Sequence, residues 1–223
     1  MACLLTPTPG EAPVFFVVEI ACRAGDLCNT GANLGDEMTD FINALITRSK
    51  EAATSEKPTQ AIRALLQDLV SDPDALRDGF DFDEETMLYE DENLSLWYTH
   101  FTPDIAVPPH EHKVNAHIAV YEGAQCNFLL KTGGARLEIA KAKRVSAGEV
   151  LSLGPDGVHA VIAAGDAVSR GIHIYQGELC KIERSLFDWE TGDALALNDA
   201  NYNASERRAK DLPDRFKTAL AGV

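Results

Sequence analysis

The sequence is short of positive charge and has no long apolar run. Lysine and arginine number 20 against 35 aspartates and glutamates, which gives a formal net charge of −15. Nucleic acids and anionic membranes attract clustered basic residues, so we expect neither as a partner. No segment is apolar over the length that a bilayer requires. Residues 1–10 also lack the charged start and apolar core of a signal peptide, so we expect a cytoplasmic protein.

Other familiar patterns are missing as well. The five cysteines are odd in number and form no CxxC pair, which argues against a zinc knuckle or a disulfide framework. No internal repeat and no phosphate-binding loop occurs, and Gly133-Gly134 fits a hairpin turn between two strands. A length of 223 residues is enough for one domain with a substantial core and a helical annex.

Helical spacing of apolar residues is confined to the first part of the chain. It occurs over residues 34–46 and 62–70, and a short third helix is expected from Pro73 to Gly79. The apolar run 14–20 has branched and aromatic residues that suit a strand, but its position before helices favours a helix.

From Thr86 onward the pattern changes to short apolar runs separated by Gly, Pro, Asn and Asp. Such spacing is typical of an antiparallel sandwich or barrel. Strands are expected over residues 94–101, 116–121, 127–131, 136–140, 149–153, 159–162 and 168–175.

These patterns of apolar residues divide the chain into three expected segments. Residues 1–85 form a mostly helical segment that packs on a barrel, and residues 86–180 form the barrel itself. Residues 181–223 are a C-terminal extension, with a loop over 185–202 and a terminal helix over 205–220.

Histidines are concentrated in the segment 108–123, PPHEHKVNAHIAVYEG. His110 and His112 are two residues apart, and on a strand such residues project from the same face. A third imidazole, from His159 later in the chain, would complete a facial triad. Neutral imidazole suits iron, zinc, nickel and copper, and open coordination positions distinguish a catalytic site from a structural one. The pattern therefore predicts a mononuclear metal site.

Longer motifs around these histidines resemble the cupin superfamily, and within it the thiol dioxygenases of the cysteine dioxygenase type. The resemblance covers residues 61–202. It implies a mainly β protein, the cupin double-stranded β-helix or jelly-roll barrel, with an N-terminal helical segment. Its carriers are PPHEH (108–112), VYEG (120–123), AGEVLSLGPDGVHAV (147–161), GIHIYQGEL (171–179) and ERSLFDWETG (183–192), the last similar to the family's closing segment.

The resemblance also implies an activity. His110, His112 and His159 would be the ligands of a ferrous ion, with nickel, zinc or copper as other candidates. His173 and Tyr175, an HxY pair, match catalytic residues that such enzymes place beside the metal; strand alternation alone would also turn both into a barrel. The implied protein is a mononuclear non-haem iron dioxygenase that acts on a small molecule, with O2 as a candidate co-substrate. Homodimers are common among cupins, and the apolar run 14–20 is a candidate interface.

His117 departs from the three-histidine pattern. It follows His112 by five residues, a spacing at which the general cupin motif has a glutamate ligand, so it is a candidate fourth ligand. Strict alternation from His112 puts it on the opposite face, and only a turn near 113–115 would reset the phase. It could instead face outward, or line the pocket as an acid or base.

Two further departures concern substrate binding and proton transfer. Glu90 stands where many family members have an arginine for the substrate carboxylate, a contact that an acidic residue cannot make. Gly171 stands where a serine often precedes the HxY pair. Cysteine is therefore expected to be a poor substrate and an amine-bearing thiol a better one. The alternatives are a lyase or isomerase that uses a four-histidine divalent metal, and a cupin that binds a metal or small ligand without turnover.

Overall fold

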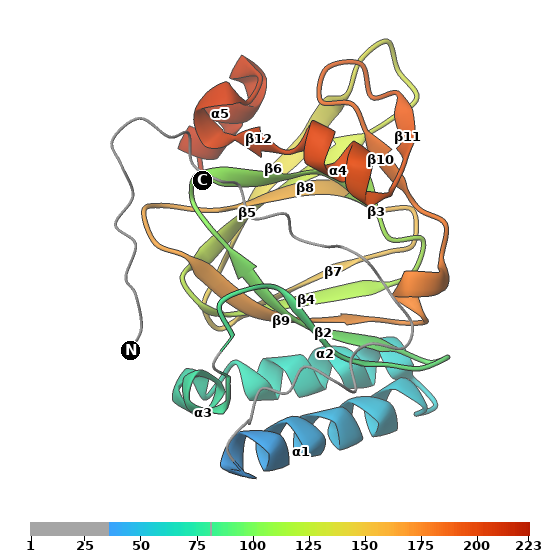
Figure 1. The fold of residues 1–223 in the computed structure, drawn as a ribbon, viewed down its shortest axis with the longest axis vertical. Helices are drawn as coiled ribbons and strands as arrows, with labels where there is room; N and C mark the ends of the chain where they lie inside the picture. Colours follow the sequence, from blue (N-terminus) through green and yellow to red (C-terminus); the bar gives the residue numbers. More distant parts are fainter. Residues whose placement is uncertain (1–35, 81) are drawn as a thin grey trace, which may run out of the picture.

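The computed structural model describes residues 36–80 and 82–223. Two antiparallel sheets face each other, with three helices against the outer side of one sheet and a short terminal helix over the other (Figure 1). The run 14–20, with its predicted helix and dimer interface, lies outside the described residues. Among the helices that are described, none combines the length and apolarity needed to cross a membrane.

The helical prediction is confirmed in the described part of the chain. The three helices are α1 (Asp36–Ala53), α2 (Pro58–Leu69) and α3 (Pro73–Gly79). Proline begins α2 and α3, at a position where its missing N–H would have had no helical partner. The helices share one apolar core with the adjacent sheet, which includes Ile62, Leu66, Leu76, Leu96, Tyr98 and Ile174.

The first sheet has the order β1-β2-β9-β4-β7 and lies against the helices. Its strands are β1 (Thr86–Glu90), β2 (Ser95–Phe101), β9 (Ser169–Tyr175), β4 (Ala116–Glu122) and β7 (Glu149–Leu153).

The second sheet has the order β11-β10-β3-β8-β5-β6, and β12 pairs with β3. Its strands are β11 (Ala194–Ala196), β10 (Ser185–Phe187), β3 (Ile105–Glu111), β8 (Val158–Ala163), β5 (Ala124–Lys131), β6 (Glu138–Ser146) and β12 (Arg207–Arg208).

The strand order defines the fold. Between β2 and β9 the chain alternates between the sheets, except at the β5–β6 hairpin, so that β2-β9-β4-β7 faces β3-β8-β5-β6. This arrangement is the jelly roll, or double-stranded β-helix, that cupins have. The predicted fold class, a mainly β double-stranded β-helix with an N-terminal helical segment, is confirmed.

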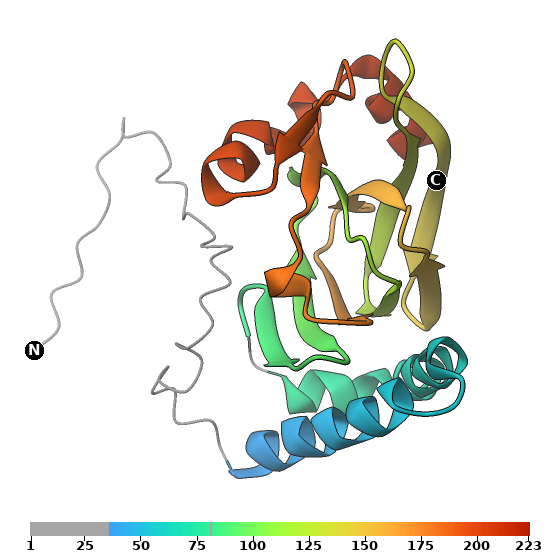
Figure 2. The ribbon, with the colours of Figure 1, turned by 90° about the vertical axis from the view of Figure 1, so that its right-hand side faces the viewer.

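The C-terminal part differs from the prediction. Of the expected helix over 205–220, only the second part is α-helical, as α5 (Asp214–Ala221), which begins directly after Pro213. The residues before it form β12 and a 3-10 turn (Ala209–Asp211), and a separate helix, α4 (Asp199–Ser205), lies in the expected loop. The expected loop over 185–202 contains β10 and β11, which extend the second sheet. Figure 2 shows this segment, orange to red, running across one end of the barrel.

Candidate metal centre

A bulge in β3 turns His110 into the barrel, next to His159 of β8. Pro108 and Pro109 have no N–H to donate to the strand ladder. The register between β3 and β8 shifts between Val107 and His110, and after the shift His110 pairs directly with His159. Because a bulge bends a strand and re-aims its side chains, two predicted ligands lie side by side at the end of the barrel.

His112, just after β3, completes a cluster. One ring nitrogen from each of His110, His112 and His159 lies within 4.8 Å of the other two, and all three side chains are buried. The Nε2 atoms of His112 and His159 are 3.0 Å apart. Two nitrogens bound at about 2.1 Å and at right angles around one ion would be separated by roughly 3.0 Å. The cluster therefore fits a facial site for one metal ion.

Hydrogen bonds fix which nitrogen two of the histidines can offer. Nδ1 of His110 lies 2.8 Å from the carbonyl oxygen of Pro108, which can only accept, so this nitrogen carries the proton. Nδ1 of His159 lies in the same way 2.9 Å from Oδ1 of Asn127. Both residues are left with a lone pair on Nε2, the arrangement that outer partners impose on metal-binding histidines.

Burial keeps all three imidazoles neutral. It lowers the pKa of His110 to about 4, although the bond to Pro108 opposes the shift. Burial also places the pKa of His112 and of His159 well below the usual value, and the neighbouring histidines add to the effect. Neutral imidazole is the form that binds metals, so the donor set is suitable near pH 7 without further change.

His117 does not belong to this cluster, and the structure gives no support to its prediction as a fourth ligand. On β4 it pairs with Ile174 of β9 and Ser152 of β7, on the face that packs against the helices. Its Nδ1 lies 2.9 Å from the Ser152 hydroxyl. Strand alternation is not interrupted within β4, so the alternative in which His117 faces out of the barrel is the one observed.

His173 and Tyr175 face into the barrel beside the cluster. The ring of Tyr175 lies 4.7 Å from that of His112, centroid to centroid, and its hydroxyl is 3.1 Å from Nδ1 of His173. Burial lowers the pKa of His173 to about 3 and raises that of Tyr175, to which the Glu85 carboxylate contributes. The pair therefore stays neutral near pH 7, with a phenol that can donate into the site.

One pocket joins these residues. Its walls bring together the three-histidine cluster, the HxY pair and several residues that the sequence did not single out. They are Glu85, Trp97, Phe101, Val107, Val161, Leu179, Arg184, Leu197 and Tyr202.

Arg184 is the most informative of these additional residues. It immediately precedes β10, and its Nε is buried with no hydrogen-bond partner among the described residues. Burial lowers its pKa, while Tyr175 and Glu85 oppose the shift, and an arginine keeps its charge in any case. Burial in turn raises the pKa of Glu85 to about 7, although Arg184 opposes that shift. The pocket thus holds a guanidinium with donors available to an anion.

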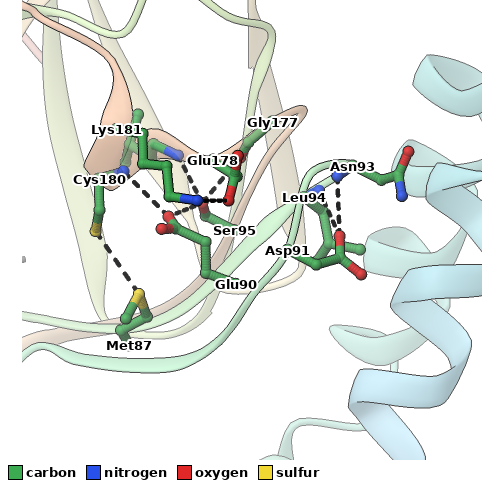
Figure 3. Close-up of polar contacts among 11 residues, drawn as sticks. Met87, Glu90, Asp91, Asn93, Leu94, Ser95, Gly177, Glu178, Cys180 and Lys181 are labelled. Atoms are coloured by element: carbon green, nitrogen blue, oxygen red, sulfur yellow. Dashed lines mark hydrogen bonds and ion pairs between the residues drawn. The ribbon is translucent and has the colours of Figure 1, made fainter. Parts of the chain in front are cut away.

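Glu90, the apparent replacement for a substrate-binding arginine, has another role. Its Oε2 accepts hydrogen bonds from the Ser95 hydroxyl and, at 3.1 Å, from the backbone N–H of Cys180 (Figure 3). The Ser95 hydroxyl accepts in turn from the N–H of Leu179. Glu90 therefore ties β1 to the segment after β9 and is absent from the pocket walls, although its charge acts on Arg184.

Comparisons with known proteins add a likeness of fold. Neither the family models nor the curated proteins give a match to the sequence. An uncharacterized conserved protein with a double-stranded β-helix domain from Klebsiella pneumoniae is 14% identical over 48% of this chain and 82% of its own, with a TM-score of 0.37. An RmlC-like cupin family protein from Methanocaldococcus jannaschii is 11% identical over 46% of this chain and 90% of its own, with a TM-score of 0.39. KdgF from Halomonas sp. is 18% identical over 45% of this chain and 91% of its own, with a TM-score of 0.36. Such values carry no argument about activity, and the fold assignment rests on the strand order.

Proposed function

We propose that the chain is a mononuclear metal-dependent enzyme that acts on a small molecule with an anionic group. The observation that carries the proposal is the buried cluster of His110, His112 and His159, whose nitrogens lie within 4.8 Å of one another. Three protein ligands leave coordination positions open, and an ion held there would supply a Lewis acid or a redox centre.

Arg184 supports an anionic substrate. It lines the same pocket as the cluster, and its buried Nε lacks a protein partner in the described part of the chain. A guanidinium binds carboxylates through two parallel hydrogen bonds, which both orients and selects them. An acid whose other end reaches the three histidines would satisfy both groups.

The leading reaction is that of an Fe(II) thiol dioxygenase. It is supported by the sequence motifs and by Tyr175 and His173, which lie beside the cluster. Cysteine also becomes a reasonable candidate substrate again, because the pocket has an arginine of its own despite Glu90.

The main alternative is a lyase or isomerase with a redox-inert ion. The version with four histidine ligands is not supported, since His117 lies on the outer face of β4, away from the three-histidine cluster. A binding protein without turnover is the third alternative, and the absence of both the family's arginine and its serine favours it. Arg184 weakens the argument from the arginine, and Tyr175 gives the pocket a proton donor that storage alone does not need.

Metal analysis tests the site itself. We expect purified wild-type protein and His117→Ala to hold close to one ion per chain, and His159→Ala to lose it. Equal metal content in His159→Ala would contradict the site, and loss in His117→Ala with an unchanged fold by circular dichroism would restore the four-histidine reading.

Turnover assays then distinguish the reactions. Protein loaded anaerobically with Fe(II) is mixed with thiols that carry or lack a carboxylate, and oxygen uptake is recorded with zinc-loaded protein as the matched control. Uptake only with iron and only with carboxylate thiols supports the dioxygenase. Conversion of substrate by the zinc form without oxygen would replace it with the lyase or isomerase.

A further inference from the structure

Behind the HxY pair, polar side chains of β2 and β9 meet inside the barrel without partners. Thr99 of β2 pairs with Gly171 of β9, between the pairs Trp97–His173 and Phe101–Ser169. Side chains alternate along a strand, so all of these positions share the face that holds His173.

Three buried polar atoms in this group have no hydrogen-bond partner in the described residues: Oγ1 of Thr99, Oγ of Ser169 and Nε2 of His173. The side chains of Thr99 and Ser169 are 0% exposed and that of His173 is 3% exposed. Buried polar groups in proteins are nearly always paired, with protein or with ordered water. Three unpaired groups on the same face of neighbouring strands therefore call for a shared partner, such as one ordered water.

Gly171 shows where the Thr99 hydroxyl lies. A Cβ atom at position 171 would be 3.1 Å from Oγ1 of Thr99 and 2.5 Å from the carbonyl oxygen of Ala119. The hydroxyl therefore occupies the space beside the glycine, next to His173 in the inward row of β9.

The ring of His173 lies close to this space. Its strand partner is Trp97, yet its centroid is 6.0 Å from that of Phe101, two inward positions further along β2. Thr99 is the inward residue between those two positions. The imidazole therefore lies near the part of β2 that holds the threonine, and because Nδ1 faces the Tyr175 hydroxyl, Nε2 is the ring nitrogen without a partner.

We propose that the Thr99 hydroxyl holds His173 at Nε2 through one ordered water, and so orients the Tyr175 phenol. Nδ1 of His173 is 3.1 Å from the Tyr175 hydroxyl, which gives the order Thr99, His173, Tyr175. If that water donates to Nε2, the proton of His173 is on Nδ1 and is donated to the tyrosine oxygen. The phenol proton is then left to point into the pocket. Thr99 is a positioning residue in this arrangement.

Nitrogen NMR of the histidine rings tests the proposal on the metal-free full-length chain, so that its result is independent of the metal and the substrate. His173 is assigned with a His173→Gln variant, and its ring shifts and tautomer are compared in wild type, Thr99→Val and Thr99→Ser. Ser49→Ala is the control, because it removes a buried, unpartnered hydroxyl in α1, away from the barrel interior.

We expect wild type and Thr99→Ser to show His173 in one tautomer with protonated Nδ1. Thr99→Val should shift the Nε2 resonance and mix the tautomers, and Ser49→Ala should leave them unchanged. Identical His173 shifts in wild type and Thr99→Val would overturn the proposal.

Thermal unfolding gives a second readout, in which Thr99→Ala serves beside Thr99→Val in case the valine is poorly accommodated. Removal of a hydroxyl that serves His173 lowers Tm, because it leaves the imidazole unpaired. Removal of a hydroxyl that serves nothing raises Tm, and that result would also contradict the proposed role.

Discussion

His159 donates its Nδ1 proton to the side-chain oxygen of Asn127, 2.9 Å away on the neighbouring strand β5. Asn127 is 0% exposed and its amide nitrogen is 3.4 Å from Oε1 of Gln125. Loss of such an outer partner typically weakens metal binding by about 10- to 100-fold, because the ligand loses its orientation. We predict this loss for Asn127→Ala, measured by titration of the metal against a competing chelator.

The control for this measurement is Asn93→Ala, in the exposed turn between β1 and β2. We expect it to bind metal as the wild type does. Equal affinities of wild type and Asn127→Ala would show that the hydrogen bond to His159 has no part in metal binding.

Arg184 leads to a prediction about substrate charge. A hydrogen bond to a charged group contributes about 1.5–3 kcal/mol, so Arg184→Gln should raise KM for carboxylate-bearing substrates by roughly 10- to 100-fold. Substrates without a carboxylate should be affected little, and Arg184→Lys should recover only part of the loss, because lysine lacks the planar fork.

Arg170→Gln is the matched control for the charge. Arg170 forms an ion pair with Glu122 at 3.0 Å and lines no part of the pocket. A rise in KM of the same size in both variants, or equal rises for charged and uncharged substrates, would exclude Arg184 as the anion-binding residue.

The parts of the site that sequence could predict are those encoded by local spacing. His110 and His112 lie two residues apart, and His159 stands in a motif of its own, so the cluster could be assigned without a structure. His117 was ambiguous because alternation and a possible turn gave opposite faces. The structure shows that alternation within β4 decides its direction.

The remaining residues depend on contacts between distant segments. Arg184 reaches the pocket because the chain after β9 returns across the end of the barrel, and no periodicity marks that return. Thr99 lies near His173 only because the register of β2 and β9 sets it opposite Gly171. In β3, the two prolines lie within the strand although proline is rarely found within a ladder, and the bulge explains their presence.

Gly171 carries a prediction about stability. A Cβ atom there would be 2.5 Å from the carbonyl oxygen of Ala119, on the adjacent strand β4, and a backbone atom in mid-sheet has little room to move. Gly171→Ala should therefore destabilise the fold by about 1–3 kcal/mol in urea unfolding.

Gly154→Ala is the comparison for that variant, since a Cβ atom at position 154 meets nothing within 4 Å. We expect its free energy of unfolding to stay within about 0.5 kcal/mol of the wild type or to rise. A Gly171→Ala protein as stable as wild type would mean that β4 and β9 can separate at little cost.

The burial of His117 leads us to predict a loss of stability in acid. It is 1% exposed beneath α2, and burial lowers its pKa, with Arg63 adding to the effect and Gln176 opposing it. A histidine whose pKa is lowered by folding stabilises the protein fully above its unfolded value, about 6.5, and loses that contribution as the pH falls. Each such group changes the free energy of unfolding by at most about 1.4 kcal/mol per pH unit.

The other buried histidines titrate in the same direction, so the informative quantity is a difference. Urea unfolding of the metal-free protein near neutral pH and near pH 5 should show a smaller loss of stability for His117→Gln than for wild type. The Ser152 hydroxyl, 2.9 Å from Nδ1 of His117, can bond to the glutamine amide as well, so packing under α2 changes little. An equal loss in both proteins would mean that His117 is already protonated in the fold, or that α2 separates from the sheet before it titrates.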